Sequence, residues 1–322
     1  MAIRRRRRSA ARDRHIPVLS VGATILLALA FLPQDRLSAH APVPPAHSRP
    51  AAAKEAAPSV EPLAVRTADL PGGFAPGACA GYDPTGFDLH RTIVVDAGHG
   101  GPDPGAVGGQ VQEKTLTLAV ALQLRDMLRS DGYRVVLTRT SDTSVAQLAT
   151  SQVRQGAVTN SGVHLDTLAR IACANASGAD ALVSIHFNAF SDPSVGGAET
   201  FYDDARSFAA DNRSLAALVQ ASLMASYGRA GWTVEDRGIH SDAATGSSGL
   251  TATAEAYGRL MELGPASQGW NDKPSLMPGV LVEPSFLTDP FELQVASSID
   301  GQRAIAAGIE QALIGFVTGG HR

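Results

Sequence analysis

Two histidines and two glutamates, far apart along the chain, have types and positions that could form a hydrolytic metal site. His99 follows a short run of β-branched residues, and His186 follows another apolar run. Glu113 opens a stretch with helical periodicity, and Glu283 ends a late apolar run. Two imidazoles and one carboxylate suit Zn²⁺, which leaves its fourth position to water in catalytic sites. We therefore predict a Zn²⁺ site whose ligands are His99, Glu113 and His186.

A metal-dependent hydrolase also needs a group that moves protons. Bound Zn²⁺ lowers the pKa of water to about 7 and polarises a carbonyl group. A further carboxylate then takes the water proton and hands it to the leaving amine. Glu283 is the expected catalytic carboxylate. Asp96 and Asn188 flank the two histidines, and we expect them to contact the ligands or the substrate.

Each of these residues also has an ordinary structural interpretation. A histidine before two glycines can be a turn residue, and a glutamate at a helix start can complement the helix dipole. Glu283, which precedes Pro284, can be a solvated loop charge. Taken one at a time, these interpretations would prevail. The joint position of the four residues favours the metal site, and that position depends on the elements that carry them.

The segment after residue 90 alternates short apolar runs with longer amphipathic ones. The expected strands cover residues 92–95, 133–138, 181–185, 197–202 and 280–282. The expected helices cover residues 116–129, 165–176, 215–227 and 305–317. This alternation predicts an α/β fold, a single domain with a mostly parallel twisted sheet flanked by helices on both faces. Functional groups of such folds collect at the carboxyl ends of the strands, so the four residues should share one edge of the sheet.

The N-terminus is typical of a secretory signal peptide over residues 1–41. A basic run, Arg4–Arg8, precedes an apolar stretch, Ile16–Leu32, and a small-residue cleavage site that ends at Ala41. An uncleaved membrane anchor is the alternative, but the stretch is short for a bilayer span and is interrupted by a proline and a glycine. We therefore expect export to the periplasm or cell wall, with no stable membrane association after cleavage.

The charge of the mature chain argues against a nucleic-acid partner. The full chain has 27 Lys+Arg and 31 Asp+Glu, and residues 1–41 contain eight arginines and two aspartates. Their removal leaves 19 basic and 29 acidic side chains, which is a formal charge of −10. Such a chain lacks the basic surface that binds a phosphate backbone.

Composition divides the exported chain into two parts. Residues 42–89 form an Ala/Pro-rich linker and lead-in segment that is too poor in large apolar side chains to build a core. Residues 90–318 form the single folded domain, which we expect to be a monomer.

The chain has two cysteines, Cys79 and Cys173. In an oxidising compartment they could form a disulfide. The bridge would close a long loop and contribute about 4 kcal/mol in the chain-entropy model. Two unpaired thiols are the alternative, because the sequence does not give the separation of the two Cα atoms.

Several motifs, taken together and in this order, resemble those of a known enzyme family. They are Asp96–Gly101 with Asp103–Ala106, Glu113–Lys114, Leu137–Thr140, Arg170–Asn175, Ser184–Ala189, Glu199–Tyr202 and Leu281–Thr288. The chain thus resembles the zinc-dependent type-3 N-acetylmuramoyl-L-alanine amidases over about residues 90–318. The resemblance implies hydrolysis of the amide bond between the lactyl group of N-acetylmuramic acid and the L-alanine of the stem peptide, in peptidoglycan or a muropeptide. It implies the same metal ligands and the same catalytic carboxylate as the argument from strand ends.

The sequence departs from the family pattern at three places. Ser285 follows Pro284 where the family usually has glycine, so the backbone beside Glu283 can differ. Residues 142–165 and 238–278 are enlargements, and long loops in a compact domain are often functional. Passive surface insertions are the alternative. We hypothesise that the 142–165 enlargement overhangs the metal site and limits access to it.

Two other functions would use the same features. A zinc carboxypeptidase acting on stem peptides would share the ligand types, and it would need a cationic clamp for a terminal carboxylate. Arg139 and Arg237 are the candidates for that clamp. A non-catalytic cell-wall-binding domain has no need of a proton-transfer carboxylate, so the presence of Glu283 argues against it.

Overall fold

The computed structural model of the chain describes residues 60–62, 70, 72–244 and 257–319. The expected signal peptide, residues 1–41, and most of the expected linker lie outside the described residues. The chain divides into two compact units, and all of the described residues belong to the second, Ala56–Arg322. None of the helices described there has the length and hydropathy that a bilayer span requires.

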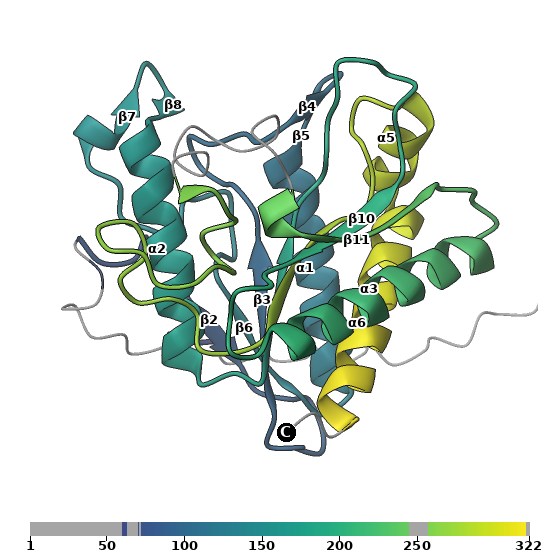
Figure 1. Ribbon diagram of the computed structural model, residues 1–322, viewed down its shortest axis with the longest axis horizontal. Helices are drawn as coiled ribbons and strands as arrows, with labels where there is room; N and C mark the ends of the chain where they lie inside the picture. The colour runs from purple at the N-terminus through teal and green to yellow at the C-terminus, as the bar shows by residue number, and fades with distance from the viewer. Residues whose placement is uncertain (1–59, 63–69, 71, 245–256, 320–322) are drawn as a thin grey trace, which may run out of the picture. The chain divides into compact units, whose positions relative to one another are not determined.

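An eight-stranded sheet runs through this unit in the order β1-β2-β6-β3-β9-β12-β10-β11 (Figure 1). The central strands β6, β3, β9 and β12 are parallel to one another. At one side of them, β10 is antiparallel to β12 and parallel to β11. At the other side, β2 is antiparallel to both β1 and β6. The strands are β1 (Val60–Pro62), β2 (Ala80–Tyr82), β3 (Thr92–Ala97), β6 (Arg134–Leu137), β9 (Ala181–Ile185), β10 (Ala198–Tyr202), β11 (Asp236–Ser241) and β12 (Gly279–Glu283).

Helices cover both faces of the sheet because its central strands are apolar on both sides. Successive side chains of a strand point to opposite faces, so Ile93 and Val95 of β3 join one buried cluster and Val94 joins another. The first cluster contains α1 (Glu113–Ser130), α3 (Ala209–Arg229), α5 (Pro290–Ser297) and α6 (Ile299–Thr318). The second contains α2 (Asn160–Ser177) and residues of the 238–278 enlargement. The expected α/β fold, with a mostly parallel sheet between helices, is confirmed (Figure 1).

Local sequence signals fix both ends of α2, the helix that carries Arg170. The Thr159 hydroxyl accepts a hydrogen bond from the amide of Gly162 at 3.2 Å, which satisfies one of the free donors at the helix start. Gly178 ends the helix in the left-handed conformation, with φ at 61°. The sequence pattern predicts only residues 165–176, because the first turn is polar and interrupts the apolar periodicity.

The structure adds elements that the sequence pattern does not predict. They are β1, β2, β11, α5, the hairpins β4 (Val107–Gly108) with β5 (Val111–Gln112) and β7 (Val153–Arg154) with β8 (Ala157–Val158), and the 3₁₀ helices η2 (Thr150–Gln152) and η3 (Asp242–Ala244). Most are too short for a periodic signal, and β11 lacks apolar alternation. The lead-in segment also contributes to the fold. Strand β2 pairs with β6 and Leu70 is buried, so the packed unit extends N-terminal to residue 90.

A disulfide joins Cys79 to Cys173, with 5.5 Å between the Cα atoms, which confirms the predicted pairing. It connects the chain just before β2 to the last turns of α2. Both cysteines are buried in the smaller of the two clusters that flank the sheet. The bridge therefore anchors α2 to the edge of the sheet.

We expect the double substitution Cys79→Ala/Cys173→Ala to lower the free energy of unfolding by about 3–5 kcal/mol, because the bridge closes a loop of 94 residues. Urea unfolding followed by circular dichroism measures the change. Wild-type protein unfolded in the presence of reductant is the matched control, and it should lose a similar amount. A loss below about 1 kcal/mol in both would mean that the bridge does not constrain the unfolded chain.

Candidate metal centre

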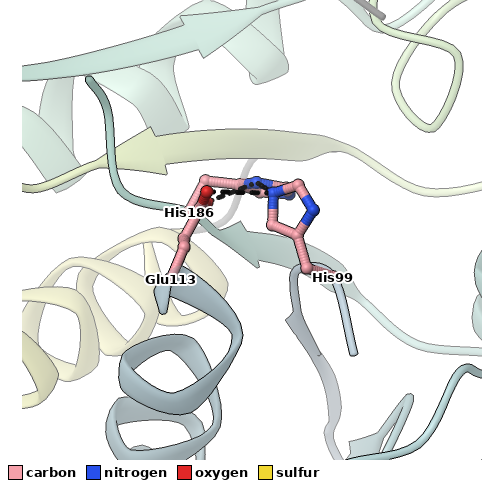
Figure 2. Close-up of side chains that lie close together, drawn as sticks. All are labelled: His99, Glu113 and His186. Atoms are coloured by element: carbon pink, nitrogen blue, oxygen red, sulfur yellow. Dashed lines mark hydrogen bonds and ion pairs between the residues drawn. The ribbon is translucent and has the colours of Figure 1, made fainter. Parts of the chain in front are cut away.

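Three side chains from separate elements meet at the carboxyl edge of the sheet (Figure 2). His99 lies in the loop after β3, His186 follows the last residue of β9, and Glu113 is the first residue of α1. His99 Nε2 and Glu113 Oε2 are 3.1 Å apart, and His186 Nδ1 and Glu113 Oε1 are 3.0 Å apart. The two imidazole nitrogens that face each other, His99 Nε2 and His186 Nδ1, are 3.1 Å apart. The structure thus brings the three sequence-predicted ligands together.

The donor set of this cluster fits a metal ion. Zn²⁺ binds nitrogen and oxygen at about 2.0–2.2 Å in a tetrahedron, which places neighbouring ligand atoms roughly 3.4 Å apart. The candidate ligand atoms all lie within 4.8 Å of one another. Glu113 is also fixed in place, because its two oxygens accept hydrogen bonds from the amides of Ala106 at 2.7 Å and Phe187 at 2.8 Å. The cluster could therefore hold a metal ion with little rearrangement.

The electrostatics of the cluster favour positive charge. Burial lowers the pKa of His99, but the Glu113 carboxylate and the hydrogen bond with Asp103 outweigh burial and raise that pKa to about 10. Burial raises the pKa of Glu113, yet the two imidazoles outweigh it and hold that pKa well below its usual range. The carboxylate stays ionised and attracts either a proton or a metal ion to the facing nitrogens.

The loop that carries His99 is bent into an unusual conformation and is held there by two buried arginines. His99 has φ at 60°, which is uncommon for any residue other than glycine. Arg170 of α2 donates to the carbonyls of Ala97 at 2.8 Å and of His99 at 2.7 Å. Arg139 donates to the carbonyls of Ala97 at 2.8 Å and Gly98 at 2.9 Å. Three consecutive carbonyls are thus saturated by guanidinium groups, and the ring of His99 is aimed at the cluster.

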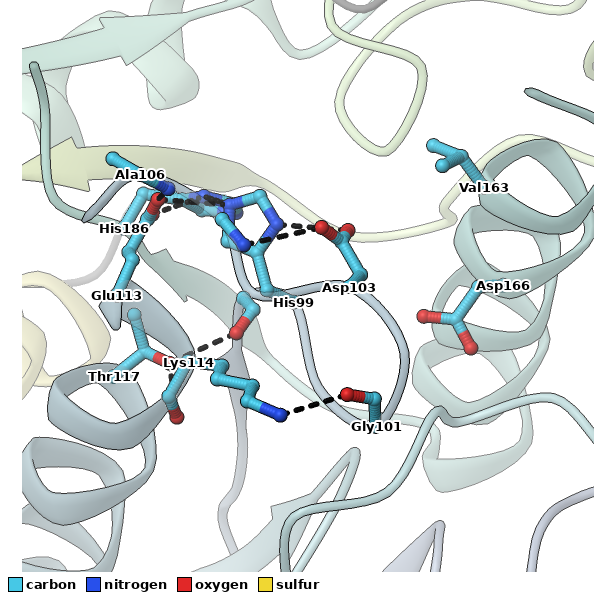
Figure 3. A network of polar contacts seen from close by, with 12 residues as sticks. His99, Gly101, Asp103, Ala106, Glu113, Lys114, Thr117, Val163, Asp166 and His186 are labelled. Atoms are coloured by element: carbon cyan, nitrogen blue, oxygen red, sulfur yellow. Dashed lines mark hydrogen bonds and ion pairs between the residues drawn. The ribbon is translucent and has the colours of Figure 1, made fainter. Parts of the chain in front are cut away.

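Asp96 has a different role from the one expected. It is fully buried and accepts hydrogen bonds from Arg170, Thr138 and Ser184, each at 2.6 Å, and among the described residues it forms no hydrogen bond with a histidine ring. The carboxylate that fixes the free nitrogen of His99 is instead Asp103, whose Oδ2 lies 2.8 Å from Nδ1 (Figure 3). The expectation for Asp96 is therefore wrong, because its side chain points to the α2 face of the sheet rather than to the loop.

Glu283 ends β12, directly beside the strand that leads to His186. Val282 pairs with Ile185 in the parallel ladder, so Glu283 and His186 are in register on adjacent strands. Burial, together with the negative charge of Glu113, raises the pKa of Glu283 well above its usual range. Its Oε2 atom has no hydrogen-bond partner among the described residues. A carboxyl group that is desolvated and unpartnered beside a metal site is suited to proton transfer.

Asn188 lies on the same edge, and within the described part of the chain its side chain forms no hydrogen bond with either histidine. Its side-chain amide donates to Glu199 Oε1 at 2.6 Å. Glu199 comes from β10, and it pairs with Glu283 in the antiparallel ladder between β10 and β12. Glu199 stands near the start of a reversed strand, so the rule that functional groups lie at the carboxyl ends of parallel strands assigns it no role.

A cavity of about 940 Å³ opens over the cluster. The three candidate ligands and Glu283 line it on one side. Residues of both sequence enlargements complete its wall, namely Ser144, Leu148, Val158 and Val163 from the first and His240, Leu260, Met261 and Glu262 from the second. In Figure 3, Val163 and Asp166 on α2 stand across from Asp103 and the histidines. The enlargements therefore border the site, as the hypothesis on the 142–165 segment requires.

Comparison with known proteins gives one family. The sequence model of the N-acetylmuramoyl-L-alanine amidase family (Amidase_3) matches residues 93–314. The germination-specific N-acetylmuramoyl-L-alanine amidase of Bacillus subtilis is 29% identical over 228 residues, which are 71% of this chain and 80% of that protein. The amidase AmiA of Salmonella typhimurium is 27% identical over 248 residues, which are 70% of this chain and 76% of that protein.

A solved structure has the same fold. The CwlD amidase of Clostridioides difficile, solved in complex with the GerS lipoprotein, superposes with a TM-score of 0.54 at 26% sequence identity. The match covers 71% of this chain and 98% of that one. The amidase Ami1 of Mycobacterium smegmatis, at 19% identity and a TM-score of 0.50, shares the fold over 73% of this chain.

We expect the affinity of the centre for Zn²⁺ to rise about tenfold per pH unit between about pH 7 and pH 9. Bound metal must displace the proton that His99 keeps up to a pKa of about 10. An imidazole with the ordinary pKa of about 6.5 would give a nearly flat response in this range. Competition with a chelator at controlled pH measures the affinity. Asp103→Asn removes the negative charge beside Nδ1, so it should lower that pKa and flatten the response, and an unchanged slope would contradict this explanation.

Proposed function

Because the chain belongs to the N-acetylmuramoyl-L-alanine amidase family, whose members are peptidoglycan hydrolases, we propose that it cleaves one specific bond of peptidoglycan. That bond is the amide between the lactyl group of N-acetylmuramic acid and the L-alanine of the stem peptide. The observation that carries the proposal is the joint position of His99, Glu113, His186 and the unpartnered Glu283 in one cavity.

The metal of this site is proposed to be Zn²⁺. His99 would bind it through Nε2, His186 through Nδ1, and Glu113 through its carboxylate. Supporting this assignment, Asp103 fixes the other nitrogen of His99 in the way that carboxylates often orient metal-bound imidazoles. When bound, Zn²⁺ lowers the pKa of a water molecule and polarises the substrate carbonyl.

Glu283 is proposed to move the proton during hydrolysis. Its carboxylate takes a proton from the attacking water, and the carboxyl group then gives that proton to the nitrogen of the leaving L-alanine. Burial and the charge of Glu113 raise the pKa of Glu283, and a bound cation would oppose that shift. The cation therefore favours the ionised form that accepts the proton of water, and burial favours the protonated form that donates to the leaving nitrogen.

The carboxypeptidase alternative loses one of its two candidate clamps. Arg139 is fully buried, and its guanidinium donates to the backbone carbonyls of Ala97, Gly98 and Lys114. It is therefore not available to a substrate. Arg237 does line the cavity, so the products of the reaction must separate the two enzyme classes.

Export is proposed as well, since an enzyme that acts on peptidoglycan must reach the cell wall. The basic and apolar segments of residues 1–41 support export through a signal peptide. The acidic charge of the mature chain and its disulfide are compatible with the same compartment.

Purified muropeptide incubated with the metal-loaded protein should yield intact stem peptide that begins with L-alanine, together with N-acetylmuramic acid whose lactyl carboxyl group is free. Mass spectrometry of the products, with metal content measured on the same preparation, checks this outcome. Release of single amino acids would identify a carboxypeptidase instead. No product from a metal-loaded, folded sample would leave a binding module as the function.

We expect Glu283→Gln to lower kcat by about 10²- to 10⁴-fold, because the substitution removes the proton acceptor and keeps the shape of the side chain. The metal content should remain that of the wild type, since Glu283 is not among the proposed ligands. Glu310→Gln is the matched control. That carboxyl group on α6 has its pKa raised to about 7 by burial and Asp131, and it lies outside the cavity. Wild-type turnover in the Glu283→Gln variant would assign the proton transfer to another group.

A further inference from the structure

We propose that Arg237 binds a free carboxylate on the stem-peptide residue that follows L-alanine, and so makes the enzyme prefer peptides in which this group is not amidated. The inference rests on the proposed amidase function and adds a substrate preference to it. Four features of the cavity wall support it: a bulge that aims the side chain, the contacts that fix it, two uncommitted nitrogen atoms, and its position relative to Glu283.

A β-bulge turns the side chain of Arg237 out of the regular ladder. In the pairing of β10 with β11, Ala198 is opposite Asp236 and Glu199 is opposite Gly238, so Arg237 is the extra residue. Gly238 follows with φ at 83°, a conformation that glycine adopts without strain. Such a bulge re-aims a side chain and strengthens the local twist. Here it directs the arginine into the cavity, where Arg237 is among the lining residues.

Three neighbours fix the guanidinium at its base. Its Nε donates to Glu199 Oε2 at 3.1 Å, and Glu199 is itself buried and held by Asn188. The guanidinium carbon stands 5.1 Å from the centre of the Phe286 ring, within the range of a cation–π contact. Gly197 leaves room for the stem, because a Cβ atom there would come within 2.7 Å of Cγ and Cδ of Arg237. The side chain is therefore held in one orientation before any substrate binds.

The outer end of the guanidinium is uncommitted. Within the described part of the chain, Nε is the atom of Arg237 that forms a hydrogen bond, and neither Nη1 nor Nη2 has a partner. About a third of the side chain, 34%, is exposed. Two parallel N–H groups on a planar guanidinium match the two oxygens of a carboxylate. A carboxamide offers only one acceptor and sets its own NH₂ group against the cation, so the geometry discriminates between the two.

The position of Arg237 suits the residue after the scissile bond. Glu283, Glu199 and Arg237 come from the neighbouring strands β12, β10 and β11. Strands lie about 4.8 Å apart, so Arg237 is roughly 10 Å from Glu283 across the sheet. An extended peptide advances about 3.5 Å per residue. When L-alanine lies beside Glu283, a carboxyl group on the next residue can reach the guanidinium.

A purely structural role is the competing explanation, in which Arg237 only neutralises Glu199. The two explanations differ in what a substitution does to two substrates. A structural role predicts equal losses for every substrate, because the cavity wall itself is damaged. A carboxylate-binding role predicts a loss confined to the peptide that carries the free carboxylate.

The experiment compares two muramoyl peptides that are identical except for the residue after L-alanine, which carries a free α-carboxylate in one and an α-carboxamide in the other. For the wild type we expect kcat/KM to be about ten- to a hundredfold higher for the free acid, with the difference mainly in KM. Arg237→Gln should erase this preference and leave kcat/KM for the amide peptide within about threefold. Arg237→Lys, which keeps the charge but loses the fork, should retain a reduced preference.

Arg303→Gln is the matched control, because Arg303 is exposed on α6 and lies outside the cavity. It should keep the wild-type preference. Equal kcat/KM for the two peptides in the wild type, or equal loss for both in Arg237→Gln, would overturn the inference. Circular dichroism of each variant confirms that it is folded.

A binding measurement separates failure of this inference from failure of the proposed function. The two peptides without the muramoyl group, free acid and amide, are titrated into metal-loaded wild type and Arg237→Gln by calorimetry. Tighter binding of the free acid by the wild type alone supports the inference even if neither muramoyl peptide is hydrolysed. Equal binding of acid and amide by the wild type would overturn the inference, whatever hydrolysis is observed.

Discussion

The buried ion pair between Arg170 and Asp96 is the interaction on which the rest of the site depends. Removing both charges from water is costly, and the pair is tolerable only because further hydrogen bonds saturate it. The hydroxyls of Thr138 and Ser184 donate further hydrogen bonds to the Asp96 carboxylate. The Arg170 guanidinium also donates to the carbonyls of Ala97, at the end of β3, and of His99, in the loop that follows. The same interaction therefore joins α2 to the sheet and gives His99 its left-handed backbone. A disulfide three residues further along α2 holds that helix against the sheet edge.

Charge balance gives the centre its chemical character. Glu113 is ionised and enclosed, its two oxygens already engaged by backbone amides, and both imidazoles face it. Such a group of donors is stabilised by a cation and destabilised without one, which is why the pKa of His99 is so high. Glu283 lies beside the same charged groups, but its Oε2 atom has no hydrogen-bond partner among the described residues. Burial and the charge of Glu113 therefore raise the pKa of Glu283, whereas the two imidazoles lower the pKa of Glu113. Two carboxylates in one cavity thus acquire different roles from their surroundings.

The antiparallel direction of β10 adds side chains to the site that the parallel strands alone would not supply. Parallel strands present their carboxyl ends at this edge, and they lead to His99, His186 and Glu283. The antiparallel β10 brings the beginning of a strand to the same edge, and with it Glu199. The bulge in β11 then adds Arg237 to the wall of the cavity. A basic group thereby joins a site whose other charged residues are mostly acidic.

The sequence by itself determined the fold class, the elements with clear apolar periodicity, and the residues that meet at the candidate metal centre. These follow from local patterns and from the general rule that parallel strands end at one edge. The partner of His99, the burial of Arg139 and the direction of β10 were decided by the tertiary structure. These three features depend on which face of the sheet a side chain occupies or on which strand lies beside it. A strand has the same local sequence pattern whether its neighbour is parallel or antiparallel to it. The cavity likewise formed only when two enlargements, far apart in the chain, packed around the same loop.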